Sequence, residues 1–383
     1  MPNIITHTIF AQEVAQKEKD RDIAALMERG EHLYVIGANG PDFLFFSHAK
    51  PWEAYKSHKL NHLGSAMHAE GINAFYAEAV RCVRRQTHTD VRKDMCAYLF
   101  GHLCHWALDM VTHPYIFYRT GDCKGKSAGY HHRMESTIDA IMLRRMRDED
   151  ITQWRSYELC TFDEDMLKAI ARIYVPCAKA VYGVDVKVHE LRETLESWHD
   201  VQKLLYDPSG RRYRLLQGAE KLIGAKWRIS GNVVPASADP RYDVMNDERR
   251  FWVHPCDDQI VSNATFMDLF TEAQDVAVQV IEAAWRCIDE GADICTIDSS
   301  ESSPLSARDF TGTPTTGSVV IDATMPGRCA APPAPAMMTP MPRLRAVLAY
   351  SHSRSGVRWA LTTRFSNSTP NASSVATASA ITS

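Results

Sequence analysis

The chain lacks an apolar run that could cross a membrane: none of its 383 residues lie in a stretch of about 18 consecutive apolar side chains. Its first residues, MPNIITHTIFAQEVAQKEKD, also lack a positively charged start, a long apolar centre and a small-residue cleavage site. We therefore expect no transmembrane segment, no secretory signal and a cytoplasmic location.

Paired cysteine motifs are absent as well. The ten cysteines are scattered, no two of them form a CxxC pair, and several lie in apolar helical runs. This distribution indicates reduced, buried thiols and disfavours a disulfide framework or a thiolate zinc site.

An excess of positive charge is the third absence. There are 43 Lys and Arg against 47 Asp and Glu, giving a formal net charge of -4. Nucleic-acid binding requires a basic field, so we do not expect DNA or RNA as a main partner. Short basic runs such as LRRMR at 143–147 are interpreted as solvated helix faces.

Strand signals are few, and the apolar residues recur with a helical period along most of the chain. The pattern predicts helices at 7–29, 61–84, 89–113, 131–148, 162–181, 188–205 and 262–290. Pro114 is expected to end the third of these helices, because proline cannot continue one. The run LYVIG at 33–37 fits either a short strand or a helix end.

Composition divides the chain near residue 296. Residues 206–261 are rich in Gly, Pro and Trp and are expected to form loops packed on the helical body. Beyond 296 the chain is rich in Ser, Thr, Pro and Ala without a periodic apolar pattern. We therefore predict an all-α fold with one multi-helix domain at 1–295 and a disordered tail at 296–383.

Histidine, in contrast, is concentrated: 12 of the 16 histidines fall within residues 1–132. The segment GHLCHWALDMVTHPY at 101–115 carries His102, His105, Asp109 and His113. A helix turns about 100° per residue, so these four side chains share one face of an otherwise apolar, buried helix. They could be core histidines bonded to one another and to the aspartate. Four such groups together favour a divalent metal, for which imidazole and carboxylate are suitable ligands.

Three other segments hold candidate ligands. HHRMESTID at 131–139 places His131 and Glu135 one helical turn apart, with Asp139 interpreted as a structural or supporting residue. In GANGPDF, Asp42 follows a proline in a turn, where a carboxylate commonly caps a helix. His7 lies at the start of the first predicted helix. An aromatic run follows Asp42, and it suits either a cleft or the core: Phe43, Phe45, Phe46 and Trp52.

Taken together, His7, GxxGPD ending at Asp42, His48, HxxxDxxxHP at 105–114 and HxxxE at 131–135 resemble the zinc-dependent phospholipase C family. More specifically, its cytoplasmic-type bacterial branch is similar to the segments MPNIITHTIFAQEV, GANGPDFLFF, YLFGHLCHWALD, THPYIFYRTG and HHRMES. The resemblance implies the all-helical fold shared with bacterial phosphatidylcholine-cleaving phospholipases and with single-strand nucleases of the trinuclear zinc type.

The resemblance also implies a ligand set for two or three Zn²⁺ ions. One zinc would be held by Asp42, His48, His105 and Asp109; a second by His113, His131 and Glu135; a third by His7 with Asp109 as a bridging carboxylate. His48 is chosen for its proximity to Asp42, with His68 as the alternative. Secreted members use a mature N-terminal Trp as a ligand, which this sequence does not show, so the third zinc rests on fewer residues.

The implied reaction is hydrolysis of a phosphodiester by zinc-activated hydroxide, with Asp42 or Glu135 orienting the water or acting as its base. The implied substrate is a phospholipid, cleaved to diacylglycerol and a phosphorylated head group, or another phosphodiester. Peripheral contact with a membrane surface would accompany a lipid substrate.

Two other functions remain open. A different metal phosphohydrolase could use the HD dipeptide at His199 and Asp200. Alternatively, the chain could keep the helical fold with an incomplete metal set and act as a non-catalytic binding module. Bound metal would separate the last alternative from the hydrolases.

Overall fold

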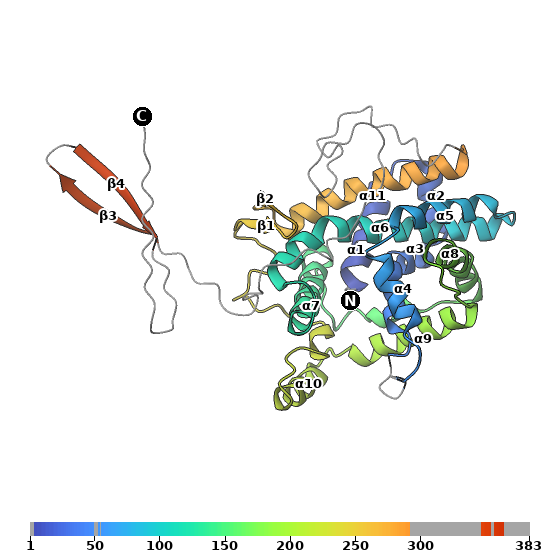
Figure 1. The fold of residues 1–383 in the computed structure, drawn as a ribbon, viewed down its shortest axis with the longest axis horizontal. Helices are drawn as coiled ribbons and strands as arrows, with labels where there is room; N and C mark the ends of the chain where they lie inside the picture. Colours follow the sequence, from blue (N-terminus) through green and yellow to red (C-terminus); the bar gives the residue numbers. More distant parts are fainter. Residues whose placement is uncertain (1–3, 50–52, 54, 292–345, 354–355, 364–383) are drawn as a thin grey trace.

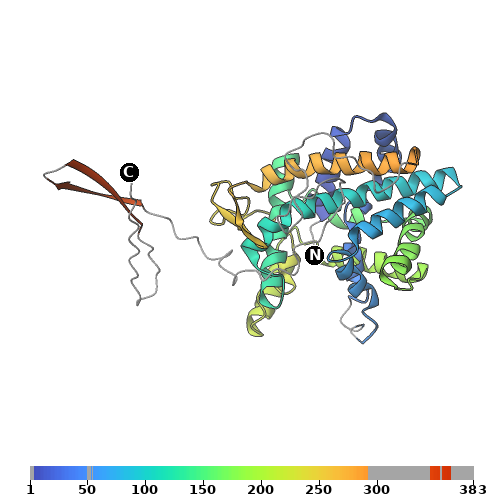
Figure 2. The same cartoon turned by 45° about the horizontal axis from the view of Figure 1, so that its top comes forward.

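The fold is taken from a computed structural model, which describes residues 4–49, 53, 55–291, 346–353 and 356–363. Within these residues the body is helical, as the sequence predicts. Its longest helix is α6 (Thr89–Thr120), whose middle is buried on all sides. Several helices pack against it, namely α1 (Ile4–Lys17), α3 (Glu31–Gly37), α7 (Lys126–Arg147), α8 (Glu164–Tyr182) and α11 (Phe266–Asp289). Figure 1 shows α11 running along α6, and Figure 2 shows the same arrangement from a second direction.

Two predicted helices are each divided by a local break. The helix expected at 7–29 forms α1 and α2 (Arg21–Arg29), because the Asp20 carboxylate accepts hydrogen bonds from the first N–H groups of α2 and starts a new helix. The helix expected at 61–84 forms α4 (Lys59–Met67) and α5 (Ile72–Arg85). Gly71 lies between them with a φ of 65°, a conformation that favours glycine.

The expectation that Pro114 ends the central helix is wrong. Helix α6 continues through this proline for almost two further turns. The residues beyond it are held by tertiary contacts: the Tyr115 hydroxyl donates to the Val244 carbonyl at 2.8 Å, and Arg119 donates to the Asp243 carbonyl at 2.8 Å. These buried contacts offset the helix hydrogen bond that proline cannot make.

Residues 33–37, which suited either a strand or a helix end, belong to helix α3. This helix crosses α6 at two glycines. A Cβ on Gly37 would lie 2.3 Å from the Tyr98 carbonyl oxygen, and one on Gly101 would lie 2.0 Å from that of Tyr34. The two backbones can approach this closely only because neither glycine has a side chain.

The segment 206–261 contains more regular structure than expected. After α9 (Val188–Leu205) come α10 (Arg211–Leu222), the 3₁₀ turn η4 (Ser230–Asn232) and an antiparallel hairpin of β1 (Trp252–His254) and β2 (Asp257–Ser262). The prediction of loops alone was therefore wrong here. Three non-glycine residues at positive φ, Trp227, Asn246 and Arg249, lie in the irregular stretches between these elements.

Most of the predicted tail lies outside the described residues, so the division at 295/296 stays a prediction. The part that the structure describes forms a hairpin of β3 (Ala346–Ser353) and β4 (Gly356–Thr363), which the composition did not predict.

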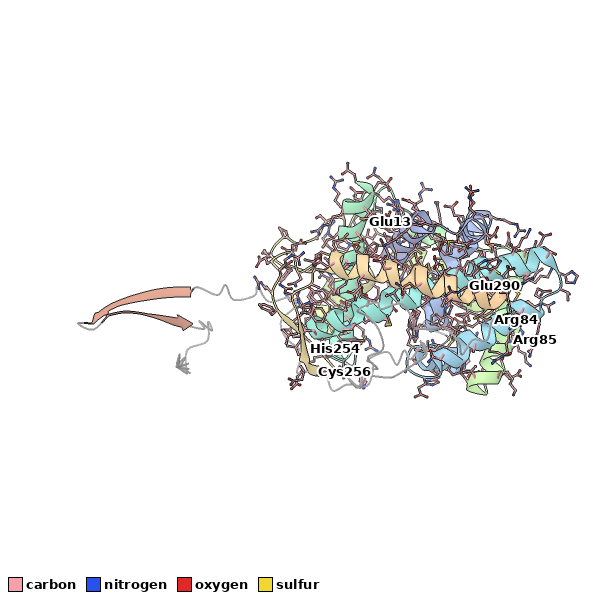
Figure 3. All side chains as sticks on the ribbon, turned by 90° about the horizontal axis from the view of Figure 1, so that it is seen from above. Glu13, Arg84, Arg85, His254, Cys256 and Glu290 are labelled. Atoms are coloured by element: carbon pink, nitrogen blue, oxygen red, sulfur yellow. The ribbon has the colours of Figure 1, made fainter. Side chains whose placement is uncertain are left out.

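The cysteines largely follow the expectation, with one exception. Among the described residues, seven cysteines form no disulfide, and most of these are buried. Cys256 is disulfide-bonded, so the expectation that all thiols are reduced was wrong at this position. Cys256 lies with His254 at the hairpin end of the body, whereas Arg84, Arg85 and Glu290 lie at the opposite end (Figure 3).

Among the described residues, no helix combines the length and apolarity that a membrane crossing needs.

Candidate metal centre

The centre is built on the buried middle of α6. His105, Asp109 and His113 lie one turn apart on this helix and are 2%, 3% and 8% exposed. Their neighbours along α6 are apolar and pack into the core on the other faces. The sequence therefore places three polar side chains where water cannot solvate them, and they must find partners inside the protein.

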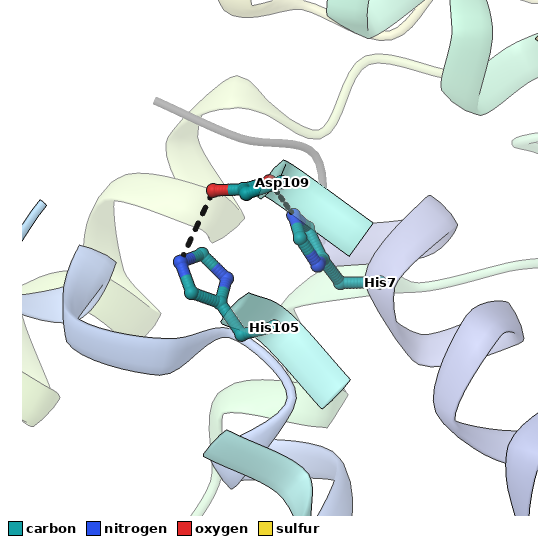
Figure 4. A group of neighbouring side chains, drawn as sticks. All are labelled: His7, His105 and Asp109. Carbon is teal, nitrogen blue, oxygen red and sulfur yellow. Dashed lines mark ion pairs between the residues drawn. The ribbon is translucent and has the colours of Figure 1, made fainter. Parts of the chain in front are cut away.

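The first group of side chains is His7, His105 and Asp109, whose ligand atoms lie within 4.8 Å of one another. The His7 Nε2 atom is 3.3 Å from Asp109 Oδ1, and the His105 Nε2 atom is 3.2 Å from Asp109 Oδ2 (Figure 4). His7 is brought to α6 by the first turns of α1, which are buried. Each carboxylate oxygen of Asp109 thus faces a different imidazole.

The second group is Asp42, His68 and His105. Asp42 lies in the 3₁₀ helix η1 (Gly40–Phe46), and its Oδ1 atom is 2.9 Å from the His68 Nε2 atom. The His68 Nδ1 atom donates to the Gly64 carbonyl at 2.7 Å, so in the neutral ring Nε2 carries the lone pair that a metal needs. Gly40, at a φ of 52°, allows the approach: a Cβ there would lie 2.1 Å from the His105 ring.

The structure places His48 away from all three groups. Its backbone has a φ of 53°, and it lines a cavity of about 240 Å³ between η1 and α9. The prediction from its proximity to Asp42 is therefore replaced by its alternative, since His68 is the histidine that contacts this carboxylate. His48 comes two residues after the end of η1, and its proximity to Asp42 along the sequence did not reveal that its side chain lines a different cavity.

The third group is His113, His131 and Glu135. His131 and Glu135 lie one turn apart on α7, where the His131 Nε2 atom is 3.0 Å from Glu135 Oε1. The His113 Nε2 atom is 3.6 Å from the same oxygen, and its Nδ1 atom donates to the Asp109 carbonyl at 3.1 Å. The Thr120 hydroxyl lies 3.2 Å from His131 Nδ1 and donates to the Ile116 carbonyl, so its oxygen accepts from the ring. Both imidazoles are thereby oriented with Nε2 toward Glu135.

Burial and neighbouring charges shift the pKa values of these buried groups in different directions. Burial acts to lower the pKa of His113, but the Asp109 and Glu135 carboxylates outweigh it and raise that pKa to about 9. Burial lowers the pKa of His105 to about 4, although Asp109 opposes the shift. Burial acts to raise the pKa of Asp109, yet His113, His105 and His7 hold it well below its usual range. The pKa of Glu135 is likewise lowered, because His131 and His113 outweigh the effect of burial.

Several buried atoms in these groups have no hydrogen-bond partner among the described residues. They are Asp42 Oδ2, His7 Nδ1 and both ring nitrogens of His105, of which Nε2 faces Asp109 at 3.2 Å without forming a hydrogen bond. Such atoms are costly to bury unless something else binds them. A nitrogen and oxygen ligand set with unsatisfied lone pairs is the chemistry that Zn²⁺ prefers, so the residues present fit this ion.

His102, the fourth member of the histidine stripe, has a different role. The Tyr76 hydroxyl lies 2.9 Å from its Nδ1 atom, and the Tyr174 hydroxyl lies 3.2 Å from its Nε2 atom. Both of its nitrogens are therefore satisfied inside the core. This histidine fits the non-metal interpretation, which the sequence left open for the stripe as a whole.

Asp139 supports the first group without joining it. Its Oδ1 atom accepts hydrogen bonds from the Thr6 N–H at 2.8 Å and from the Thr6 hydroxyl at 2.5 Å. Thr6 precedes His7, so this carboxylate fixes the start of α1 against α7. Burial raises the pKa of Asp139 to about 7, although the bonds from Thr6 oppose the shift.

The aromatic run after Asp42 is mostly core. Phe43 and Phe46 are buried, and their rings lie 5.3 Å from Tyr174 and 6.4 Å from Trp198. Phe45 is the exception, because it is partly exposed and its ring lies 5.5 Å from that of His68. Trp52 lies outside the described residues.

The HD dipeptide shows no comparable centre. His199 and Asp200 pair with each other at 3.5 Å on a partly exposed part of α9. Within the described ranges, neither joins a group of three metal-ligating side chains. The alternative hydrolase that uses this dipeptide has no support in the geometry.

Two small cavities border the groups. One of about 30 Å³ is lined by His7, Asp109, His113, Glu135 and, from α11, Phe266. The other, of about 20 Å³, lies beside His68 and His105 and is lined mainly by apolar side chains. Each could hold about one water molecule.

Comparison with known proteins adds one finding. Residues 6–184 match a family model described as zinc dependent phospholipase C. No curated protein and no solved structure matches the chain. The members of all three groups, which run from His7 to Glu135, lie inside the matched segment.

Proposed function

We propose that the chain is a zinc-dependent phosphodiester hydrolase of the phospholipase C type, acting on a glycerophospholipid. The observation that carries the proposal is the convergence of eight imidazoles and carboxylates, seven of them buried, into three groups within the segment that matches the family model. We extend it to the cytoplasmic-type bacterial branch and to a cytoplasmic location, on the basis of the motifs MPNIITHTIFAQEV and GANGPDFLFF.

Three sets of residues would each hold one zinc ion. Asp42, His68 and His105 would hold one zinc; His7, His105 and Asp109 another; and His113, His131 and Glu135 a third. Zinc bound there supplies a Lewis acid that neutralises phosphoryl oxygens and lowers the pKa of water.

Asp42 is the better placed of the two predicted catalytic carboxylates. Its Oδ2 atom is buried and has no hydrogen-bond partner among the described residues, so it can orient a water molecule and accept its proton. Glu135 Oε1 lies close to both His131 and His113, which leaves that oxygen less available. We therefore assign the general base to Asp42 and a ligand role to Glu135.

The test measures zinc per chain and phosphodiester hydrolysis together, on protein purified without chelator. We expect two or three zinc ions in the wild type and release of a phosphorylated head group from a short-chain phosphatidylcholine. Asp109→Asn should lose at least one zinc and nearly all activity, because it weakens contacts to three histidines.

Asp200→Asn is the matched control, since this aspartate belongs to the HD dipeptide. It should keep both the zinc content and the activity. Fewer than two zinc ions together with no hydrolysis would favour the non-catalytic module with its incomplete metal set, and a wild type without zinc would overturn the proposal.

A further inference from the structure

We propose that α10 and the loop after it form a docking element for an anionic lipid bilayer surface. The surface, which we call the α10 patch, consists of residues 211–229. It goes beyond the proposed activity, because it concerns where the protein binds and uses none of the metal-ligating residues. In both views of the fold, α10 lies at the edge of the helical body (Figures 1 and 2).

The α10 patch turns its apolar side chains outward. Leu215 and Leu222 are 75% and 89% exposed, and Ile223 and Ile229, which follow in the loop, are 74% and 51% exposed. Leu215 and Leu222 lie seven residues apart and so share one face of α10, with Gly218 between them. A Cβ on Gly218 would meet nothing within 4 Å, so this face has no protein neighbour among the described residues. An apolar stripe on the solvent side is the reverse of an ordinary surface helix.

Cations flank this stripe. The segment 211–229 carries six basic side chains, all exposed: Arg211, Arg212, Arg214, Lys221, Lys226 and Arg228. Its single acid, Glu220, is buried on the opposite face. The patch is therefore strongly positive on a chain whose formal net charge is -4.

Glu220 holds the patch in shape. Its carboxylate accepts hydrogen bonds from the N–H groups of Trp227 at 3.0 Å, Ile229 at 2.6 Å and Ser230 at 2.9 Å. The Glu220 carboxylate thus holds the loop against α10, and its negative charge lies away from the outer face of the patch. These bonds join the loop to α10, so the two parts of the patch lie together.

The patch is also attached to a helix of the candidate metal centre. Gly129 of α7 approaches the loop so closely that a Cβ there would lie 2.8 Å from the Lys226 carbonyl oxygen. The Ser136 hydroxyl of α7 donates to the Gly231 carbonyl at 2.7 Å. Since α7 also carries His131 and Glu135, docking of the patch would fix the orientation of the centre relative to the bound surface.

Charge and hydrophobicity together identify the occupant. An outward apolar stripe flanked by Lys and Arg is the pattern of a helix that lies in the interface of an anionic membrane. Nucleic-acid phosphates would use the cations but leave the leucines and isoleucines in water. A second copy of the chain would bring six like charges against six, which is unfavourable.

The experiment measures sedimentation of the full-length protein with large unilamellar vesicles. One set contains phosphatidylcholine alone and the other contains phosphatidylcholine with about one third phosphatidylglycerol. We expect binding to the anionic vesicles that weakens as salt rises. Leu215→Glu/Leu222→Glu/Ile223→Glu should abolish it, and Arg211→Glu/Arg214→Glu/Lys221→Glu should lower it at least about 100-fold.

The matched control is Val188→Glu/Phe251→Glu, which places acids at two exposed apolar residues outside the patch. It should bind as the wild type does. Zinc content and hydrolysis of a soluble short-chain substrate should be unchanged in all these variants, which separates docking from catalysis.

Two results would overturn the inference: a wild type that ignores anionic vesicles, or patch variants that bind them normally. Self-association through these residues without vesicle binding would likewise replace it with a dimer interface. Vesicle binding by a chain that proves to lack hydrolase activity would support the inference and count only against the proposed function.

Discussion

Asp109 connects the first and third groups of the candidate centre. Its Oδ1 atom faces His7 at 3.3 Å and His113 at 3.4 Å, and its Oδ2 atom faces His105 at 3.2 Å. A carboxylate with both oxygens so engaged can serve two metal ions at once. The pKa of His113 is raised because this ring faces the carboxylates of both Asp109 and Glu135, whereas at His105 burial outweighs the carboxylates and lowers the pKa.

His68 and His48 provide a matched pair of substitutions for the ligand assignment. Because His68 contacts Asp42 and His48 does not, His68→Asn should remove about one zinc per chain and lower hydrolysis at least about 10- to 100-fold. His48→Asn should change neither, since asparagine tolerates the positive φ at this position. Zinc analysis and initial rates on the two variants decide the assignment. Loss of metal from the His48 variant alone would restore the assignment made from sequence proximity.

Asp139 predicts a pH dependence of stability. Its pKa is raised to about 7 in the folded protein, against about 4 for an exposed aspartate, so the folded state holds the proton more tightly. The stability from this residue is complete below about pH 4 and is lost as the pH rises to about 7. Asp139→Asn keeps an acceptor for Thr6 without a charge. Above pH 7 it should therefore raise the free energy of unfolding by a few kcal/mol relative to the wild type.

Urea unfolding at pH 5 and pH 8 measures this difference. Asp165→Asn, at an exposed position on α8, is the control and should leave the pH dependence nearly unchanged. Equal effects of Asp139→Asn at both pH values would contradict the raised pKa.

For individual residues, the sequence predicted which side chains lie together where one helix carries several polar residues. The spacing of His105, Asp109 and His113 predicts their common face, and the structure shows it. The partner of Asp42 could not be settled in this way. His68 comes directly after a separate helix, α4, and its distance from Asp42 along the sequence does not indicate that the two side chains meet.

Among the helices, the crossing of α3 and α6 sets how close η1 comes to the centre. Gly101→Ala should destabilise the protein by about 1–3 kcal/mol or more, because the new methyl group would lie 2.0 Å from the Tyr34 carbonyl oxygen and the backbone would have to move. Gly218→Ala in α10 is the matched substitution, since nothing lies within 4 Å of its Cβ position. There the change should stabilise by about 0.5–1 kcal/mol through helix propensity.

Chemical unfolding of the two glycine variants gives the comparison. Similar free energies of unfolding for both would mean that the helices do not cross as closely as the structure shows.

Helix positions were predictable from apolar periodicity, but their ends were not. Proline normally ends a helix, but α6 continues beyond Pro114 because Tyr115 and Arg119 are held by hydrogen bonds to other parts of the fold. Their partners lie more than a hundred residues later in the sequence. Local propensity could not reveal those contacts. Helix α10 was missed because the Gly, Pro and Trp content of residues 206–261 indicated loops, and this composition hid one short helix within the segment.

Across the whole molecule, the segment that matches the family model does not enclose the centre alone. Phe266, at the start of α11, lines the cavity beside His7 and Asp109. Helix α11 then runs along α6, and the region before it anchors the end of α6 through Val244 and Asp243. The later part of the helical body therefore excludes water from ligands that come from the earlier part, which strengthens every charge interaction among them.

Zinc should accordingly stabilise the entire helical body. A ligand that binds only the folded state at about 1,000 times its dissociation constant adds roughly 4 kcal/mol of stability. For a body of this size that corresponds to a rise of about 8–16 °C in Tm. A chelator should reverse the rise, and Mg²⁺ at the same concentration should not reproduce it, because these ligands are mainly imidazoles.

The stabilisation should also depend on pH. His113 has a pKa raised to about 9, so it carries a proton at pH 7 that zinc must displace. The increase in Tm caused by zinc should therefore grow between pH 7 and pH 9, and it should be smaller in Asp109→Asn. Differential scanning calorimetry at fixed free zinc measures both effects. A Tm that is independent of zinc would mean that the buried histidines are satisfied without metal, and the hydrolytic proposal would then lose its foundation.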